Sequence, residues 1–178
     1  GLHPGFGGTV RTVRLVGVRA SMKLMLTGKS IRVSAARKIG LVDRLCNAEE
    51  WQNQARELVN IQPKLSTAPF LEKILNLAIF RGFIAKTLTK QVKSKAKQAH
   101  YPAPYAMIKL WKENGASQKT AYKAEARSMA ELMCGSTSQN LIRVFFLQNK
   151  LKTQLPRAAS SIKNIHVIGA GIMGGDIA

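Results

Sequence analysis

Three glycines near the end of the 178-residue sequence, Gly169, Gly171 and Gly174, follow the apolar run 165–168. Their spacing is typical of a dinucleotide-binding turn: the first makes the tight turn, the second lets the backbone approach a pyrophosphate, and the third lets a helix pack on the preceding strand. We therefore expect a strand, a glycine turn and a helix whose first N–H groups bind phosphates. The alternative is a flexible glycine-rich tail, which would not need the apolar run.

The same motif predicts that the sequence is one part of a longer protein. The acidic residue that contacts the ribose stands roughly twenty positions after such a turn, and the sequence ends at Ala178. The other end gives a similar indication, because Gly1 begins in a loop-like stretch without a starting methionine or a signal peptide. Either the chain is a fragment or the glycine spacing is accidental.

The charge balance is strongly basic. Twenty-eight Lys and Arg face nine Asp and Glu, which gives a net charge of +19. Such a surplus predicts an anionic partner, either nucleic acid, a membrane surface or a phosphorylated small molecule. Because aromatic residues make up only 6% and no zinc-finger spacing is present, we expect no nucleic-acid partner.

Two further features of the composition bear on the class of protein. Hydrophobic residues make up 46% of the chain, enough for one domain with a core, and no apolar run has the length of a membrane-spanning helix. Cys46 and Cys134 lie far apart without metal-ligand spacing. We expect both to be buried thiols in a reducing cytoplasm, and we expect no metal site.

Helical periodicity and turn residues predict four helices in the first third of the chain. They cover residues 9–15, 20–26, 35–39 and 48–60. Thr9 and Ser34 are the expected N-caps of the first and third, and Gly28 is expected to end the second. Helix 48–60 is amphipathic, with its glutamates Glu49, Glu50 and Glu57 on the solvated face.

Four sequence blocks resemble the enoyl-CoA hydratase/isomerase (crotonase) superfamily. They are Gly1-x-x-Pro4-Gly5-x-Gly7-Gly8-Thr9, Arg14–Gly17, Leu26–Gly28 and Ala36–Asp43. In that family the loop that contains the equivalent of Gly5 lies beside the acyl-CoA thioester, and its backbone N–H helps to orient the water that adds to the double bond. The resemblance implies that Pro4 and Gly5 form a substrate loop for a coenzyme A thioester.

The resemblance also implies what residues 1–178 lack. The family's catalytic glutamates and oxyanion-hole amides lie N-terminal to the position that matches Gly1. Water addition needs donors for the developing enolate oxygen and a carboxylate that moves the proton. Because Glu49, Glu50 and Glu57 are expected on a solvated helix face, we expect no hydratase activity from this chain alone.

The middle of the chain, 62–112, contains ten Lys or Arg and a single acidic residue. The apolar stretch 70–85 is followed by a predicted basic helix, 86–97. Four lysines are expected on one face of that helix: Lys86, Lys90, Lys93 and Lys97. Such a pair could lie in a membrane interface, or it could be a core helix beside a solvated one, and periodicity leaves both interpretations open.

Helices are also expected in the last part of the chain, over 106–112, 119–134 and 139–152. Two prolines in 101–105 predict a break in the helical pattern. Ser136 or Ser138 is the expected N-cap of the last helix, and residues 153–161 are the expected linker into the strand at 165.

Three later blocks resemble the helical bridge of multifunctional fatty-acid oxidation enzymes, a family that includes the α-subunits of fatty-acid β-oxidation complexes. They are Tyr101–Ile108, Glu125–Ala130 and Asn140–Leu147. In those enzymes a crotonase domain is followed by a helical bridge and then by an NAD-dependent 3-hydroxyacyl-CoA dehydrogenase. The resemblance implies an α/β parent enzyme, of which this chain is a mainly α fragment ending in the first βα turn of a Rossmann domain.

The resemblance implies four segments: the end of the crotonase-like domain at 1–60, helical extension and bridge at 61–152, linker at 153–164, and the start of the NAD-binding domain at 165–178. NAD would contact Gly169, Gly171, Ile172, Met173 and Gly174. The implied partners are acyl-CoA, a thiolase β-subunit and a peripheral membrane contact in a bacterial cytoplasm. The competing hypothesis is a non-catalytic basic module that binds acyl-CoA phosphates, anionic lipid or the thiolase.

Overall fold

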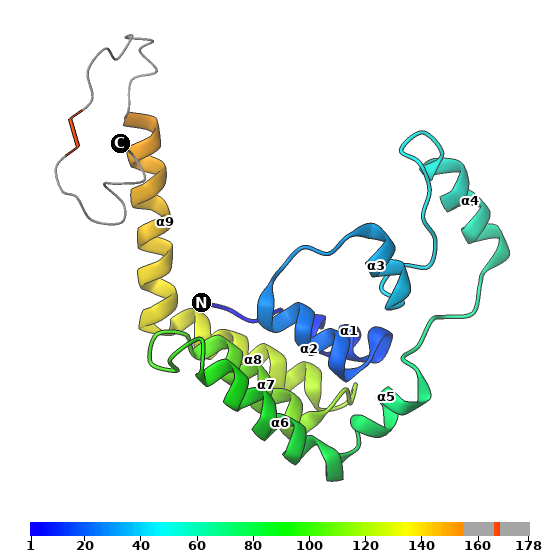
Figure 1. The fold of residues 1–178 in the computed structure, drawn as a ribbon, viewed down its shortest axis with the longest axis horizontal. Helices are drawn as coiled ribbons and strands as arrows, with labels where there is room; N and C mark the ends of the chain where they lie inside the picture. Colours follow the sequence, from blue (N-terminus) through cyan, green and yellow to red (C-terminus); the bar gives the residue numbers. More distant parts are fainter. Residues whose placement is uncertain (155–165, 168–178) are drawn as a thin grey trace. The chain divides into compact units, whose positions relative to one another are not determined.

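The computed structural model describes residues 1–154, 166 and 167 (Figure 1). These residues form nine helices and no strand. The helices are α1 Gly8–Val16, α2 Val18–Thr27, α3 Val33–Lys38, α4 Trp51–Ile61, α5 Phe70–Leu75, α6 Ala78–Lys93, α7 Pro102–Asn114, α8 Ala121–Cys134 and α9 Ser136–Gln154. The prediction of a mainly α chain is confirmed for this part. The predicted strand and glycine turn lie outside the described residues, apart from His166 and Val167, which have no regular structure.

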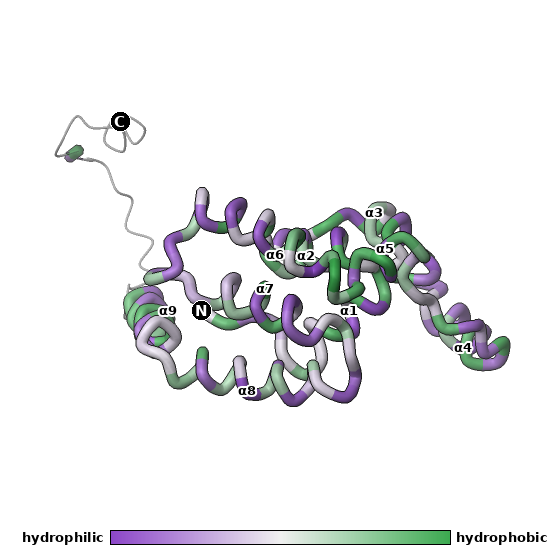
Figure 2. The backbone as a smooth tube through the Cα atoms, turned by 90° about the horizontal axis from the view of Figure 1, so that it is seen from below, coloured by the Kyte–Doolittle hydropathy of each residue, from purple (hydrophilic) through white to green (hydrophobic). Residues whose placement is uncertain are grey.

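The chain divides into two units, residues 1–142 and 143–178. In the first unit α7 packs between α6 and α8, so that the three helices form one layer (Figure 1). The consecutive helices α1 and α2 pack on each other and lie across this layer. In the second unit α9 contains both apolar and polar residues (Figure 2), including the apolar run 144–147. Phe145 and Phe146 are 57% and 64% exposed there, with their rings packed edge to face.

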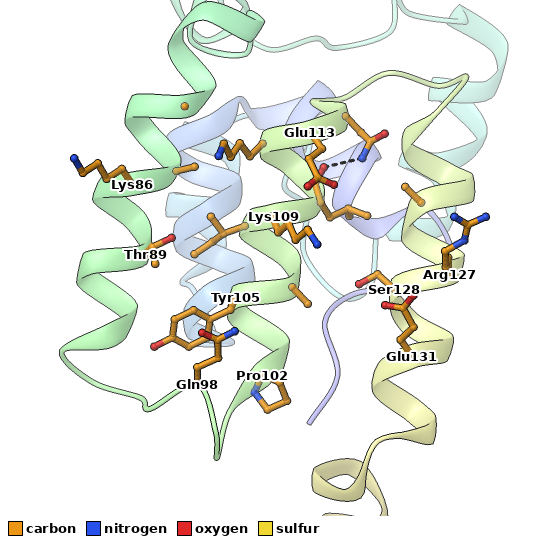
Figure 3. A pocket seen from close by; sticks show the side chains of 18 residues that line it. Lys86, Thr89, Gln98, Pro102, Tyr105, Lys109, Glu113, Arg127, Ser128 and Glu131 are labelled. Carbon is orange, nitrogen blue, oxygen red and sulfur yellow. Dashed lines mark hydrogen bonds between the residues drawn. The ribbon is translucent and has the colours of Figure 1, made fainter.

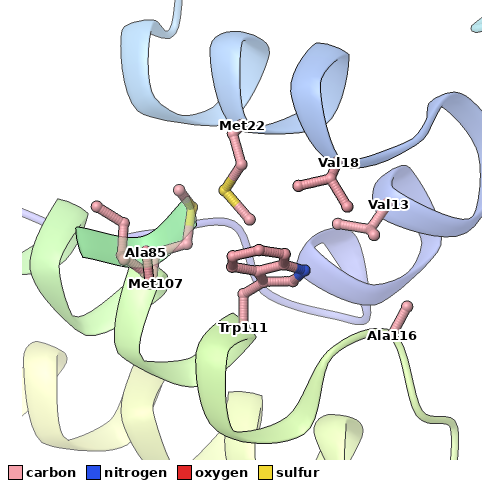
Figure 4. Packing of buried hydrophobic residues seen from close by; sticks show 8 residues of the cluster. Val13, Val18, Met22, Ala85, Met107, Trp111 and Ala116 are labelled. Atoms are coloured by element: carbon pink, nitrogen blue, oxygen red, sulfur yellow. The ribbon is translucent and has the colours of Figure 1, made fainter. Parts of the chain in front are cut away.

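Trp111 of α7 is the centre of the core in the first unit (Figure 4). Its indole is 2% exposed and packs with Val13 of α1, Val18 and Met22 of α2, and Met107 one turn earlier in its own helix. A buried indole N–H needs an acceptor. Asn76 supplies it, since its Oδ1 lies 2.9 Å from Trp111 Nε1. The core therefore joins the first two helices of the chain to α7.

Three predicted helix N-caps are wrong. Ser136 and Ser138, one of which was expected to cap the last helix, both lie inside α9. Helix α1 begins at Gly8 with Gly7 as its N-cap, so Thr9 lies inside the first turn. Helix α3 has Arg32 as its N-cap, and Ser34 lies inside it. The reason in α1 is tertiary: the N–H and the hydroxyl of Thr9 both donate to Glu125. The end of α2 is as predicted, because Gly28 has a left-handed conformation with φ 59°.

The predicted division into an apolar stretch, 70–85, and a basic helix, 86–97, is also wrong. The chain breaks at Leu77, which has an extended conformation and is the N-cap of α6. Helix α6 then contains both apolar and basic residues and ends at Lys93, so Lys97 lies in the following turn. The break follows from the core, because Asn76 is held by Trp111 at this point.

Helix α7 begins earlier than predicted. It starts at Pro102, whereas the two prolines were expected to delay the helix to residue 106. Proline is compatible with the first helical turn, where the missing N–H would have no intrahelical acceptor. The hydroxyl of Tyr105 donates to the carbonyl of Ala96 and ties this turn to the preceding connection.

The prediction of buried thiols is wrong as well, since Cys46 and Cys134 are both exposed. Cys46 lies in the connection between α3 and α4, and Cys134 is the last residue of α8. Helix α4 contains no buried residue, and its expected apolar face is open to solvent, with Trp51 57% exposed. As predicted, Glu57 is exposed; its Oε2 lies 3.2 Å from Arg44 Nη1.

Candidate functional site

The glycine-rich segment 1–9 forms a tight loop that leads into α1. Phe6 and Gly7 both have a positive φ, 54° and 82°, and the N–H of Gly8 donates to the carbonyl of Gly5 at 2.9 Å. Left-handed geometry at Gly7 is accessible because glycine has no Cβ. Among the described residues the Gly5 N–H donates to no other group, and neither do the N–H groups of His3 and Phe6 in the same loop. Gly5 thus presents one of several unpaired backbone donors of the loop.

A buried carboxylate from α8 holds the end of this loop. Glu125 is 2% exposed. Its Oε1 accepts the N–H of Gly7, and its Oε2 accepts the N–H of Thr9 at 2.9 Å together with the Thr9 hydroxyl. The first N–H groups of a helix have no intrahelical acceptor. Glu125 supplies those acceptors from more than a hundred residues away and places a negative charge at the positive end of the α1 dipole.

The start of the loop is held by His3, which is 5% exposed. Its Nδ1 lies 2.7 Å from the carbonyl of Pro4, and its Nε2 lies 2.8 Å from Ser128 Oγ of α8. A carbonyl only accepts, so Nδ1 carries a proton and donates it to Pro4, while Nε2 is hydrogen-bonded to the Ser128 hydroxyl. His3 is therefore a structural residue of the loop.

The N-terminus of α2 has the same construction as that of α1. Its N-cap is a glycine, Gly17, with φ 85° and ψ 175°. Glu72 of α5, which is 7% exposed, accepts the Arg19 N–H at 3.1 Å and the Arg19 Nε at 2.6 Å. Two consecutive helices thus begin with a glycine and obtain their capping carboxylate from a distant part of the chain.

A groove with a volume of about 1040 Å³ runs over α7 between α6 and α8 (Figure 3). It is lined by four cations, Lys86, Lys109, Lys112 and Arg127, and by two carboxylates, Glu113 and Glu131. No ion pair joins them in the described part of the chain. Its lining includes Ser128, whose Oγ lies 2.8 Å from His3 Nε2, but the other ring nitrogen of His3 faces the Pro4 carbonyl and no carboxylate. None of residues 1–9 lines the groove. Its cations suit it to attracting an anion.

A family model described as enoyl-CoA hydratase/isomerase matches residues 1–127. The chain belongs to the enoyl-CoA hydratase/isomerase family. Enzymes of this family act on coenzyme A thioesters. The match includes the loop and α1, and it extends through α7 into α8 as far as the turn that contains Glu125. The family therefore includes both sides of the contact between the loop and α8.

The predicted sites of this hydratase-family chain are distributed unequally. Pro4 and Gly5 lie in the loop that α8 covers, and both are half-buried. Lys86, Lys90 and Lys93 are exposed along α6, whereas Lys97 lies outside that helix. The predicted NAD-binding residues lie outside the described residues: Gly169, Gly171, Ile172, Met173 and Gly174. In the described part, no group of three or more metal-ligating side chains forms, and no helix is long and apolar enough to cross a membrane.

Sequence reasoning missed the two capping glutamates. Glu125 was part of a block that resembled the helical bridge, and Glu72 was noticed only as the single acid of a basic stretch. One signal for Glu72 was available, because a lone acid among ten cations in an apolar context suggests a specific partner. For Glu125 the signal was the absence of a capping side chain in Gly5–Gly8, which implies that another segment supplies it.

Substitution of Gly17 tests the cap of α2. Its φ and ψ are essentially restricted to glycine, so an alanine costs about 1–3 kcal/mol in backbone strain, and its Cβ would lie 2.8 Å from Glu72 Cδ. We expect Gly17→Ala to lower the free energy of unfolding by at least about 2 kcal/mol in urea denaturation.

The matched control for Gly17 is Gly82→Ala in α6. A Cβ at Gly82 would have no heavy atom within 4 Å, and alanine is a better helix former than glycine by about 1 kcal/mol. We expect Gly82→Ala to be neutral or stabilising. Equal stability of the two variants would contradict the proposed role of Glu72 at Gly17.

Proposed function

We propose that this chain is part of a bifunctional fatty-acid β-oxidation enzyme that hydrates 2-enoyl-CoA and oxidises the resulting 3-hydroxyacyl-CoA with NAD. The observation that carries the hydratase step is the loop at Gly5, which has an unpaired N–H and is fixed at both ends by α8. An N–H in a fixed orientation can hold a water molecule against a bound thioester and so lower the entropic barrier to its addition.

The hydration adds a hydroxyl group to C3 and a proton to C2 of the conjugated thioester. The Gly5 N–H would orient the water, but proton transfer needs a carboxylate. Glu125 does not fit that role because three donors occupy its oxygens. The exposed Glu49 and Glu50 are not near a loop or groove that could hold the substrate. The proposal therefore assigns proton transfer and the oxyanion donors to sequence outside residues 1–178.

The dehydrogenase step rests on the glycine spacing at Gly169, Gly171 and Gly174 and on the resemblance of the preceding helices to a bridge. If NAD were held there, it would supply the acceptor for the hydride from C3 of the hydroxyacyl group, and the hydroxyl proton would leave to a base. The glycine turn would bind the pyrophosphate of NAD. A first βα turn without neighbouring strands lacks both its sheet and the ribose-binding acid, so we expect residues 1–178 alone to bind NAD weakly or not at all.

A coupled assay tests the proposed function. We expect the natural full-length protein to produce NADH from crotonyl-CoA and NAD, and residues 1–178 alone to leave the absorbance of the conjugated thioester unchanged. A Cβ at Gly5 would lie 2.6 Å from Met129 Cε, so Gly5→Ala should displace the end of that flexible side chain. The added methyl group beside the Gly5 N–H should disturb the bound water and lower kcat for hydration about tenfold or more. Gly82→Ala is the control and should retain the wild-type rate.

Three results would contradict this assignment. The first is a rate on crotonyl-CoA from residues 1–178 alone that Glu57→Gln abolishes, because Glu57 would then be the catalytic acid. The second is saturable binding of NAD to the same chain at micromolar concentration. The third is a full-length Gly5→Ala enzyme with the kcat of the wild type.

A second candidate function, contact with an anionic membrane surface, is favoured by the composition of α6. On the face opposite the core, Ile79 and Phe83 are 81% and 77% exposed. Helical geometry places Lys86, Lys90 and Lys93 on the same face further along the helix. An exposed face that is apolar at one end and cationic at the other suits a lipid interface. A thiolase partner stays a prediction from the resemblance.

Liposome co-sedimentation tests the membrane contact. We expect the triple variant Lys86→Gln, Lys90→Gln, Lys93→Gln to bind vesicles containing anionic lipid at least about tenfold more weakly, since each lysine near the surface contributes about 1 kcal/mol. The charge-matched control replaces the exposed Lys29, Lys38 and Lys123. Equal losses in the two triple variants would show that net charge, and not this face, determines binding.

A further inference from the structure

One face of α8 contacts the glycine-rich loop at four residues, His3, Gly5, Gly7 and Thr9. The residues that form it are spaced three and four apart, which places them on neighbouring turns. The contacts are Tyr122 beside Gly7, Glu125 on Gly7 and Thr9, Ser128 on His3, and Met129 beside Gly5. Contacts with α8 therefore hold the loop, together with two contacts made from its own side of the structure, His3 to the Pro4 carbonyl and Arg11 to the Phe6 carbonyl.

Glu125 is the central contact of this face. It is buried, and among the described residues its carboxylate forms no ion pair with Lys, Arg or His. All three of its hydrogen bonds come from Gly7 and Thr9. A buried carboxylate needs such donors to offset its lost hydration. The contact is thus mutual: the loop donors satisfy Glu125, and Glu125 satisfies the first N–H groups of α1.

We propose that Glu125 is a positioning residue for the coenzyme A thioester loop: through Gly7 and Thr9 it fixes the orientation of the Gly5 N–H. This inference rests on the proposed function, in which that N–H orients the attacking water. Gly5 and Gly7 are separated by one residue with a positive φ, and the Gly5 carbonyl is bonded to the Gly8 N–H. A shift at Gly7 is therefore transmitted to the Gly5–Phe6 peptide and, through the Gly5 Cα, to the Pro4–Gly5 peptide, which carries the Gly5 N–H and whose carbonyl is also held by His3.

The inferred role predicts which kinetic constant responds. Glu125 does not touch Gly5 itself, and its oxygens are directed to the start of α1. Loss of its charge would change the orientation of the water at Gly5 more than the affinity for the acyl-CoA. A change confined to the reacting geometry lowers kcat and leaves KM, whereas a general loss of folded protein lowers the concentration of active enzyme and the thermal midpoint together.

The test uses Glu125→Gln in the natural full-length protein, with crotonyl-CoA as the substrate. Glutamine has the same shape, but it places an NH2 group against a backbone N–H. We expect kcat for hydration to fall about tenfold with KM within about twofold of the wild type. Thr9→Val removes only the hydroxyl contact and should lower kcat by about two- to fivefold. Glu49→Gln, an exposed change of the same charge, is the control and should match the wild type.

A structural measurement separates this inference from the proposed function. In 15N-labelled residues 1–178, Glu125→Gln should shift the amide signals of Gly5, Gly7 and Thr9, and Glu49→Gln should not. Unchanged signals at all three, or a Glu125→Gln enzyme with an altered KM and an unaltered kcat, would overturn the positioning role. Shifted signals, together with a full-length wild-type protein that does not hydrate crotonyl-CoA, would support the loop contact and refute the proposed function. Thr9→Val, which retains the carboxylate, allows the same tests if Glu125→Gln does not fold.

Discussion

Buried carboxylates at glycine-started helices are the interaction on which the first unit of this chain depends. The N-caps of helices α1 and α2 are Gly7 and Gly17, which have no side chain that could cap the helix. Glu125 and Glu72 supply the acceptors from distant helices. Loss of an ordinary N-cap costs about 0.5–2 kcal/mol, and a carboxylate left buried without donors would add to that cost. Each contact therefore determines whether two distant segments pack together.

The two glutamate contacts and the core around Trp111 both position helices α1 and α2. Trp111 joins α7 to the sides of α1 and α2, and the glutamates fix the starts of those two helices. The loop at Gly5 directly precedes the first turn of α1. Its geometry is consequently a property of α8 and α1 together, and the family match, which extends to residue 127, includes both of them.

The sequence predicted those features of the fold that depend on neighbouring residues. The helix end at Gly28 follows from local backbone chemistry, and this glycine has a positive φ. The errors arise where tertiary contacts decide. Thr9 has the composition of an N-cap, but Glu125 takes both of its donors. The α5–α6 break occurs at Leu77, beside Asn76 and its bond to Trp111. The loop residues Pro4 and Gly5 were predictable from their motif, whereas the glutamate that holds the loop required knowledge of the pairing between α1 and α8.

Amide hydrogen exchange in the unmodified chain tests the central claim most directly. If Glu125 holds the start of α1, the Gly7 and Thr9 amides, which have no intrahelical acceptor, should exchange as slowly as the backbone amide of Trp111 in the core, because only the global opening of the first unit would release them. The amide of the exposed Lys29 gives the fast reference. Exchange of Gly7 and Thr9 at the rate of Lys29 would contradict the account, because the carboxylate would then not hold the loop.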